Sequence, residues 1–133
     1  MWKVIYSKHL PLGREMNAMA VWPFIIVKKS RAKYFTARVE RHERIHLAQQ
    51  GELLPVAVVL AAVLVAAGSG WWSLLALPLY FWLYAILFVW KFLGCWNWLM
   101  AYQRNPLEME AYGYECQVFY PGHRKPFAWT GFL

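Results

Sequence analysis

Aspartate is missing from this sequence, because all seven of its acidic residues are glutamates, against fourteen lysines and arginines. Any carboxylate that binds a metal ion or moves a proton must therefore come from a glutamate. Cysteine is scarce, since Cys95 and Cys116 are the only two and do not form a C-x-x-C pair, which favours free thiols over a disulfide or a cysteine metal site. The first residues lack an apolar run of signal-peptide length, so we expect no cleaved secretion signal.

Charge is absent from a long central part of the chain. The stretch from Leu53 to Trp90 contains no lysine, arginine or glutamate, whereas ten of the fourteen basic residues lie within residues 1–52. The run from Trp71 to Trp90 reaches the ~20 residues that cross a bilayer core. The run from Leu53 to Gly68 is long enough only if the polar residues from Gln49 to Glu52 lie at the headgroups. These runs predict two transmembrane helices.

Gly68-Ser69-Gly70 separates the two apolar runs by a tight connection and so predicts a helical hairpin. Tryptophans stand at both ends of the second run, as in aromatic belts at membrane interfaces: Trp71, Trp72, Trp90, Trp96 and Trp98. The basic residues before the hairpin predict that both termini and the active site are cytoplasmic. A soluble protein with a buried hairpin is the alternative, but 133 residues hardly suffice to cover two such helices. The lipid bilayer is thus an expected partner, and without a recognisable binding motif no nucleic acid is expected.

The expected fold class is a mainly α membrane protein with a transmembrane helical hairpin, a short C-terminal helix and a small N-terminal β element. A single domain, 1–133, is divided into four parts: a basic β/loop part at 1–35, a helix at 36–67 that becomes the first apolar span, a second span at 71–100, and a helix with a tail at 105–133. Within the first part, Met19 to Val27 is rich in β-branched and aromatic residues and predicts a strand. Pro23 favours an edge position for that strand.

Residues 42–46 spell HERIH, an H-E-x-x-H pattern inside the predicted helix. His42 and His46 are one helical turn apart, so both imidazoles project from one face and can reach a single Zn²⁺ at about 2.0–2.1 Å. Glu43 is rotated from His42 by roughly 100° and can act as a general base on a water molecule. Gln49 lies on the histidine face, where it can contact a ligand or substrate. The alternative is an exposed helical turn with Glu and Arg partners.

A catalytic zinc ion usually needs a third protein ligand, and the remaining candidates are His9, Glu108, Glu110, Glu115 and His123. Asn105 is a good N-cap and Pro106 suits the first helical position, so a helix begins where the chain returns from the second span. That helix would lie beside the one that carries the histidines, which favours Glu108 as the ligand. As the third residue of the new helix, Glu108 can alternatively close a capping box on Asn105.

The HERIH pattern followed by Glu108-Met109-Glu110-Ala111 resembles the gluzincin metallopeptidases, and most nearly their integral-membrane type represented by HtpX and the CAAX prenyl endopeptidases. This resemblance implies zinc ligation by His42, His46 and Glu108, with Glu43 as the general base. Those enzymes carry a later E-x-x-A-D, but the Asp position is Tyr112 here. The group that orients a zinc histidine must then be Glu110, Glu115 or a backbone carbonyl. The chain would be a minimal version of the family.

The sequence thus predicts a membrane-bound zinc-dependent endopeptidase that hydrolyses peptide bonds at the cytoplasmic membrane surface. The peptide or protein substrate is expected to pair with the strand, along Val21, Trp22, Phe24, Ile25, Ile26 and Val27. Donors to the charged intermediate are sought among His123, which is preferred, and Tyr112, Tyr114 and Tyr120. Two alternatives remain open, namely a non-catalytic small membrane protein with a structural metal site and one with an accidental H-E-x-x-H.

Overall fold

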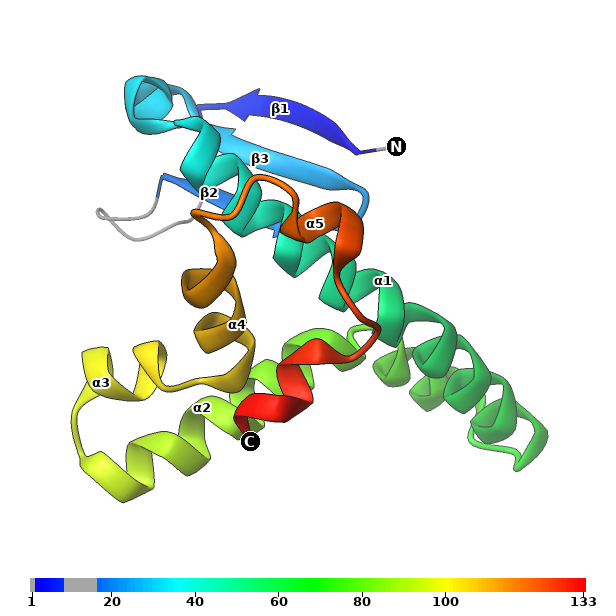
Figure 1. The fold of residues 1–133 in the computed structure, drawn as a ribbon. Helices are drawn as coiled ribbons and strands as arrows, with labels where there is room; N and C mark the ends of the chain where they lie inside the picture. Colours follow the sequence, from blue (N-terminus) through cyan, green and yellow to red (C-terminus); the bar gives the residue numbers. More distant parts are fainter. Residues whose placement is uncertain (1, 9–16) are drawn as a thin grey trace.

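The computed structural model describes residues 2–8 and 17–133, which form a small sheet and a larger set of helices (Figure 1). Helices dominate, which confirms the prediction of a mainly α protein with a small N-terminal β element. The strands are β1 (Lys3–Ser7), β2 (Ala18–Val21) and β3 (Phe24–Lys28). The α-helices are α1 (Ala37–Ala66), α2 (Leu79–Cys95), α3 (Trp98–Gln103), α4 (Pro106–Tyr114) and α5 (Tyr120–His123), and the 3₁₀ helices are η1 (Lys29–Tyr34), η2 (Gly70–Ala76) and η3 (Ala128–Phe132).

The sheet has the strand order β1-β3-β2, with β1 parallel and β2 antiparallel to β3. The prediction of one edge strand from Met19 to Val27 is wrong. Trp22 and Pro23 form the turn between β2 and β3, because Pro23 has no amide hydrogen to donate to a strand ladder. In the observed strand order, β3 is the central strand and β2 is an edge strand.

One face of the sheet packs on the first half of α1 (Figure 1). Ala18 and Ala20 of β2 alternate with more exposed neighbours, as do Ile25 and Val27 of β3, so each strand turns every second side chain toward the helix. These four side chains form a buried cluster with Leu47 of α1. The contact fixes β2 against the helix that carries the H-E-x-x-H residues.

Helix α1 is continuous over 30 residues, close to the predicted range of 36–67. Thr36 caps its start, where the hydroxyl oxygen accepts a hydrogen bond from the amide of Val39. Gly68, with a φ of 82°, follows its end and begins the turn of the predicted hairpin. The second half of α1 is apolar and largely exposed. Among the described residues, α1 is the one unbroken helix that is long and apolar enough to cross a membrane.

The predicted second span at 71–100 is not one helix, which corrects that prediction. The chain forms η2, bends by 63°, and then forms α2. Pro78 occupies the N-cap position of α2, and a proline inside a continuous helix would lack the amide hydrogen that the helix needs. Trp96, in a left-handed conformation at φ 50°, ends α2 before α3 begins. The bent pair of η2 and α2 is long and apolar enough for a membrane span only as a unit.

Helix α4 returns the chain to the first half of α1, as the hairpin predicted (Figure 1). The Asn105 side chain accepts a hydrogen bond from the amide of Leu107 at 3.2 Å, and Pro106 is at the first turn, so the predicted helix start is confirmed. Leu107 is fully buried in a second apolar cluster, whose other buried members are Leu53, Tyr80, Leu87 and Trp129. This cluster joins α1, α2, α4 and η3 beside the candidate site.

Candidate metal centre

Three side chains from two helices meet between α1 and α4. His42, His46 and Glu108 each offer a ligand atom, and these atoms all lie within 4.8 Å of one another. The two histidine Nε2 atoms are 3.1 Å apart. Nε2 of His42 is 3.3 Å from Oε2 of Glu108, and Nε2 of His46 is 3.5 Å from Oε1 of the same carboxylate. All three residues are buried. The predicted ligands are therefore brought together.

The Glu108 carboxylate faces the histidines and does not close a capping box. Its Oε1 accepts a hydrogen bond of 2.9 Å from the hydroxyl of Tyr84, a residue of α2. The amide of Asn105, which a capping box would bind, donates instead to the carbonyl of Tyr102 at 3.1 Å. Of the two roles that the sequence left open for Glu108, the geometry supports the one at the histidine pair.

The cluster fits a metal ion. Oε2 of Glu108 is buried and accepts no hydrogen bond from any residue that the structure describes, although it points toward His42. Such an unsatisfied buried carboxylate oxygen is costly, and a bound cation would satisfy it. Two imidazole nitrogens and a carboxylate form the donor set of a divalent transition-metal site such as zinc. Within residues 2–8 and 17–133 no fourth His, Cys or Glu joins the group.

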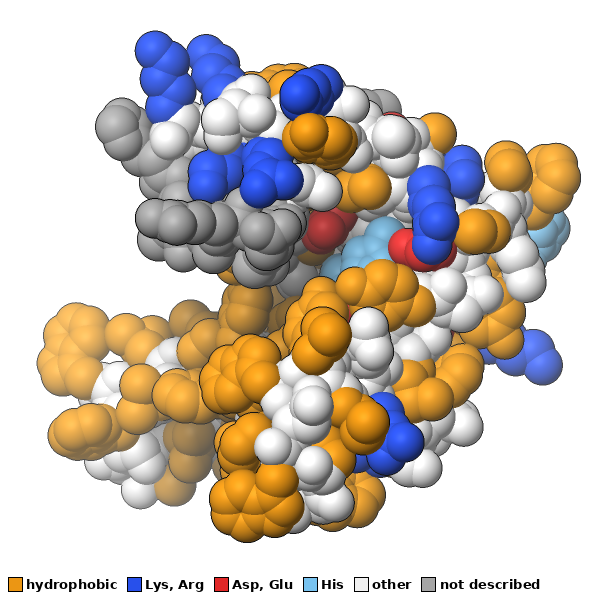
Figure 2. Space-filling view, turned by 90° about the vertical axis from the view of Figure 1, so that its left-hand side faces the viewer, with side chains coloured by type: hydrophobic (Ala, Val, Ile, Leu, Met, Phe, Trp, Pro, Cys, Tyr) orange, Lys and Arg blue, Asp and Glu red, His pale blue; other side chains and the backbone are white. Residues whose placement is uncertain are grey.

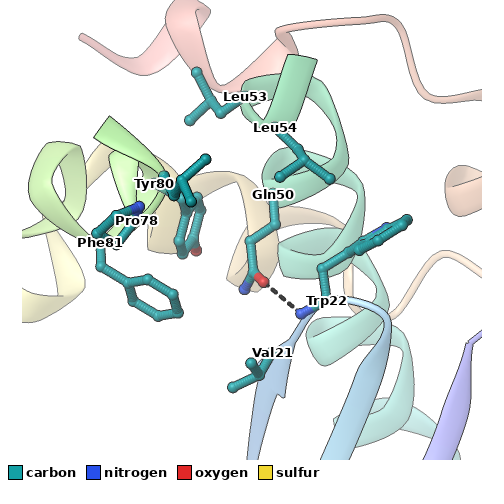
Figure 3. A pocket seen from close by; sticks show the side chains of 9 residues that line it. Val21, Trp22, Gln50, Leu53, Leu54, Pro78, Tyr80 and Phe81 are labelled. Atoms are coloured by element: carbon teal, nitrogen blue, oxygen red, sulfur yellow. Dashed lines mark hydrogen bonds between the residues drawn. The ribbon is translucent and has the colours of Figure 1, made fainter. Parts of the chain in front are cut away.

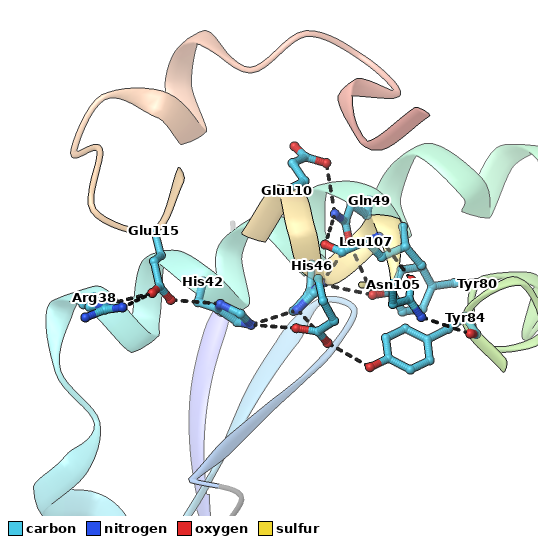
Figure 4. A network of polar contacts seen from close by, with 11 residues as sticks. Arg38, His42, His46, Gln49, Tyr80, Tyr84, Asn105, Leu107, Glu110 and Glu115 are labelled. Atoms are coloured by element: carbon cyan, nitrogen blue, oxygen red, sulfur yellow. Dashed lines mark hydrogen bonds and ion pairs between the residues drawn. The ribbon is translucent and has the colours of Figure 1, made fainter. Parts of the chain in front are cut away.

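His42 is oriented by Glu115, which follows the last residue of α4 (Figure 4). Oε2 of Glu115 lies 3.0 Å from Nδ1 of His42, so Nδ1–H donates to the carboxylate and the lone pair of Nε2 faces the cluster. The guanidinium of Arg38 donates to Oε1 of Glu115 at 2.7 Å, and Arg41 donates to its backbone carbonyl at 2.7 Å. Of the carboxylates left open by the sequence, Glu115 is the one that contacts a ligand histidine.

His46 is oriented by the side-chain amide of Gln49 instead of by a carboxylate (Figure 4). Its Nδ1–H donates to Oε1 of Gln49 at 2.9 Å. Nε2 of Gln49 donates in turn to the Leu107 carbonyl and to Oε2 of Glu110, both at 3.0 Å. Gln49 and Glu110 are fully buried. Gln49 thus contacts a candidate ligand, the first of the two roles predicted for it, and Glu110 lies one hydrogen bond further from the histidine.

The charges of the cluster shift its pKa values in the metal-free protein. Burial is the largest single effect and opposes ionisation of both His46 and Glu108, but the combined attraction between the histidines and the carboxylates outweighs it. It raises the pKa of His46 to about 9 and holds the pKa of Glu108 well below its usual range. For Glu43 burial dominates and raises the pKa, while the nearby histidines and a backbone hydrogen bond from Ala20 oppose the shift. The Glu43 carboxylate is therefore a buried proton acceptor whose pKa is influenced by the charges of all three members of the cluster.

The remaining predicted site residues have different positions. The ring of Tyr112 packs edge-on against His42, with the ring centroids 4.6 Å apart. His123 is exposed on α5 and is not part of the cluster of ligand atoms. His9 lies outside the described residues. Tyr80 and Tyr84, which sequence analysis missed, hydrogen-bond to Gln49 and Glu108, and their spacing of four residues in an apolar helix was the available signal.

The predicted substrate strand, from Val21 to Val27, needs correction. Residues from Phe24 onward belong to β3, which already pairs on both sides, and Ile25 is buried in the core. Among the described residues, no strand pairs with the outer side of β2. Ala18, Ala20 and Trp22 direct their backbone groups to that side, away from β3, as expected from the antiparallel register. Ala20 and Trp22 are hydrogen-bonded to the Gln50 side chain of α1 at 2.9 and 2.7 Å.

A pocket of about 150 Å³ lies at this strand end (Figure 3). Its walls come from the end of β2, from α1 and from the start of α2, and are mainly apolar: Val21, Trp22, Gln50, Leu53, Leu54, Leu77, Pro78, Tyr80 and Phe81. The hydroxyl of Tyr80 is 3.2 Å from Nδ1 of His46, so one wall of the pocket touches a candidate ligand. A cavity of this volume can hold a benzene-sized group.

Some histidine and acidic side chains come to the surface on one side of the molecule. Figure 2 shows histidine and acidic side chains in a hollow between a part rich in lysine and arginine and a part covered by hydrophobic side chains. The basic side chains come mainly from the residues before and at the start of α1, and the hydrophobic ones from the helices that follow. The site therefore lies where the charged and the apolar parts of the chain meet.

Comparison with known proteins gives no family assignment. No family model matches the chain, and neither curated proteins nor solved structures provide a match. Function must therefore be inferred from the side chains of the site and their surroundings.

Proposed function

We propose that this protein is a membrane-bound zinc endopeptidase of the gluzincin type, with His42, His46 and Glu108 as metal ligands. The observation that carries the proposal is the convergence of these three ligand atoms with a second carboxylate, Glu43, buried beside them. Structural zinc sites usually have four protein ligands, whereas catalytic sites have three and leave a position for water or substrate. The three ligands found among the described residues favour the catalytic kind.

Each residue of the centre has a distinct part in peptide hydrolysis. When bound, zinc would polarise the scissile carbonyl and make water a better nucleophile. Glu43 accepts the proton of the attacking water and delivers it to the leaving amine, as a general base and then a general acid. Glu115 and Gln49 hold the two imidazoles with their Nε2 lone pairs directed inward. Because His123 is not part of the cluster, Tyr112 beside His42 is the better candidate to donate to the charged intermediate.

The substrate would bind as an extended strand along the outer side of β2, beside Glu43. Backbone hydrogen bonds to an edge strand give affinity without demanding a particular sequence. Ala18 offers outward backbone groups. The Ala20 carbonyl and the Trp22 amide are bound to the Gln50 side chain, and the Ala20 amide to Glu43, so a substrate would have to displace these side chains. The adjoining apolar pocket would receive a hydrophobic side chain close to the scissile bond.

Membrane insertion is supported by exposed apolar surface on the helical part. Only 22% of the most apolar window of α1 is buried within the protein. Trp71 and Trp72, at the far end of the hairpin, are 87% and 75% exposed. So much exposed apolar surface is unfavourable in water and typical of a lipid-facing surface. His46 precedes Leu53 by about two helical turns, roughly 10 Å, so cleavage would occur close to the cytoplasmic membrane surface.

Purified protein in detergent micelles provides the test. We expect it to cleave unfolded or membrane-proximal peptide segments, to lose this activity when a chelator removes the metal, and to regain it on addition of about one equivalent of Zn²⁺. Substrates with a large apolar residue next to the cleaved bond should be preferred, because of the pocket. A protein that binds zinc tightly but cleaves no peptide in a diverse library would contradict the proposal.

A further inference from the structure

Arg124, in the segment after α5, is a cation buried close to the metal centre. Its side chain is only 4% exposed, and it forms ion pairs with two glutamates, Glu110 of α4 and Glu52 of α1. Glu110 is itself fully buried. Its Oε1 accepts from Nε of Arg124 at 2.5 Å and from the hydroxyl of Tyr120 at 2.9 Å, while its Oε2 accepts from Nη2 of Arg124 at 3.0 Å.

From Glu110 the hydrogen bonds continue without a break to the histidine. Oε2 of Glu110 accepts from Nε2 of Gln49 at 3.0 Å, and Oε1 of Gln49 accepts from Nδ1 of His46 at 2.9 Å. Figure 4 shows the part of this chain from Glu110 to His46. A buried arginine far along the chain from His46 is thus connected to it through two side chains.

The chemistry of these groups determines which way the Gln49 amide faces. The carboxylate of Glu110 and the carbonyl of Leu107 can only accept hydrogen bonds, so the NH₂ of Gln49 must face them. Its oxygen is then directed at His46, which must carry its proton on Nδ1. When the second proton leaves Nε2, its lone pair becomes available there, where the metal would bind. The hydrogen bonds from Arg124 hold the Glu110 carboxylate in place, and so maintain the acceptor on which this arrangement depends.

We propose that Arg124 and Glu110 form a positioning pair that sets the orientation and proton position of His46 for metal binding. The inference rests on the proposed metal site. A second arginine–carboxylate pair, Arg38 and Glu115, contacts His42 on the other side of the cluster. Each histidine is therefore connected by hydrogen bonds to an arginine–glutamate ion pair. Glu115 binds His42 directly, whereas Glu110 acts on His46 through the side-chain amide of Gln49. Through Arg124 the C-terminal segment becomes part of the metal centre.

A double variant separates positioning from folding. Replacing a buried ion pair by apolar residues of similar size is often neutral for stability, whereas removing one partner leaves a buried charge. Glu110→Leu combined with Arg124→Leu removes both charges of the fully buried pair, and Glu52 keeps its hydrogen bond from the Phe127 amide. The double variant should therefore keep the metal-free fold, measured by circular dichroism and thermal unfolding in detergent. Its zinc affinity, measured by competition with a chelating dye, should fall by about 10-fold or more. Bound Co²⁺ should show a changed visible absorption spectrum, because the geometry of the His46 ligand changes.

Glu52→Gln is the matched control. It removes the other ion pair of Arg124, while the new amide oxygen at position 52 can still accept from the Phe127 amide, which Glu52 now binds at 2.9 Å. The hydrogen bonds from Arg124 to His46 are untouched, so zinc affinity should change by less than about threefold and the Co²⁺ spectrum should stay the same. Arg124→Lys retains a cation next to Glu110 and should preserve most of the zinc affinity.

Two results would overturn the inference. One is a folded double variant with the zinc affinity and Co²⁺ spectrum of the parent, and the other is an equal loss of affinity in Glu52→Gln, which would show a general effect of loosening the C-terminal segment. Failure of the metal site itself has a different signature, since the parent protein would then bind neither Zn²⁺ nor Co²⁺.

Discussion

The Nε2 atoms of His42 and His46 lie 3.1 Å apart and both face the same carboxylate, that of Glu108. Behind each ring, Nδ1 is occupied by a residue that can hold it in one tautomer, Glu115 for His42 and Gln49 for His46. Two imidazoles arranged in this way repel or share a proton unless a cation lies between them. The pair is therefore organised for a metal ion before the ion binds.

His46→Ala should remove most of the bound zinc, because the remaining His42 and Glu108 form an incomplete ligand set. Metal analysis of the purified variant by plasma mass spectrometry measures the loss. His123→Ala serves as the control, since His123 is exposed and lies outside the cluster, and it should retain one zinc per chain. Full zinc occupancy in His46→Ala would show that the metal binds elsewhere.

Glu115→Leu should weaken zinc binding by about 10- to 100-fold, because His42 loses the acceptor that fixes its ring. Arg38→Met should have a much smaller effect, since the Arg38 side chain is 62% exposed and solvent screens its ion pair with Glu115. Zinc competition with a chelating dye measures both variants. Equal losses would mean that the arginine contributes more to the site than its exposure suggests.

The local features of the site were predictable from sequence, because helix spacing and capping depend on neighbouring residues. The face shared by His42, His46 and Gln49 follows from 3.6 residues per turn, and the start of α4 follows from Asn105 and Pro106. Glu115 could have been chosen over Glu110 by the same rule. It follows Glu108 by about two helical turns and so lies on the same face of α4.

The long-range features were not predictable in this way. Period-two burial indicates a strand, but the central position of β3 depends on pairing with β1, which lies some 20 residues earlier in the chain. Arg124 meets Glu110 only because the segment after α5 folds back over α1 and α4. The break between η2 and α2 could have been predicted from the sequence, because Pro78 lacks the amide hydrogen that a continuous helix needs at that position.

Membrane topology can be tested by cysteine labelling in a variant that lacks Cys95 and Cys116. A cysteine at position 69, in the turn after α1, should react with an impermeant reagent added outside intact cells, because the basic residues before α1 predict a cytoplasmic N-terminal part. A cysteine at position 30, at an exposed residue of η1, should be protected until the membrane is opened. The reverse labelling pattern would move the metal centre to the opposite compartment.

Strand-like substrate binding can be tested on the substrate, which avoids disturbing the fold. Each backbone nitrogen of a cleaved peptide is methylated in turn, and KM is measured for each analogue. Methyl groups on alternate residues should raise KM, because only every second amide of an added strand faces β2. An equal rise of KM for every methylated position would argue against pairing with β2. As a control, the zinc content of the enzyme should be the same in every assay.

The turnover of Glu43→Gln tests the central claim most directly. Glutamine keeps the size of the side chain but cannot accept a proton, and Glu43 is not among the three ligand groups, so the variant should bind zinc with nearly the affinity of the parent. Its kcat for peptide cleavage should fall by about 100-fold or more, the usual contribution of a general base. A zinc-loaded Glu43→Gln protein that cleaves peptides as fast as the parent would contradict the proteolytic mechanism and leave the metal as a structural link between α1 and α4.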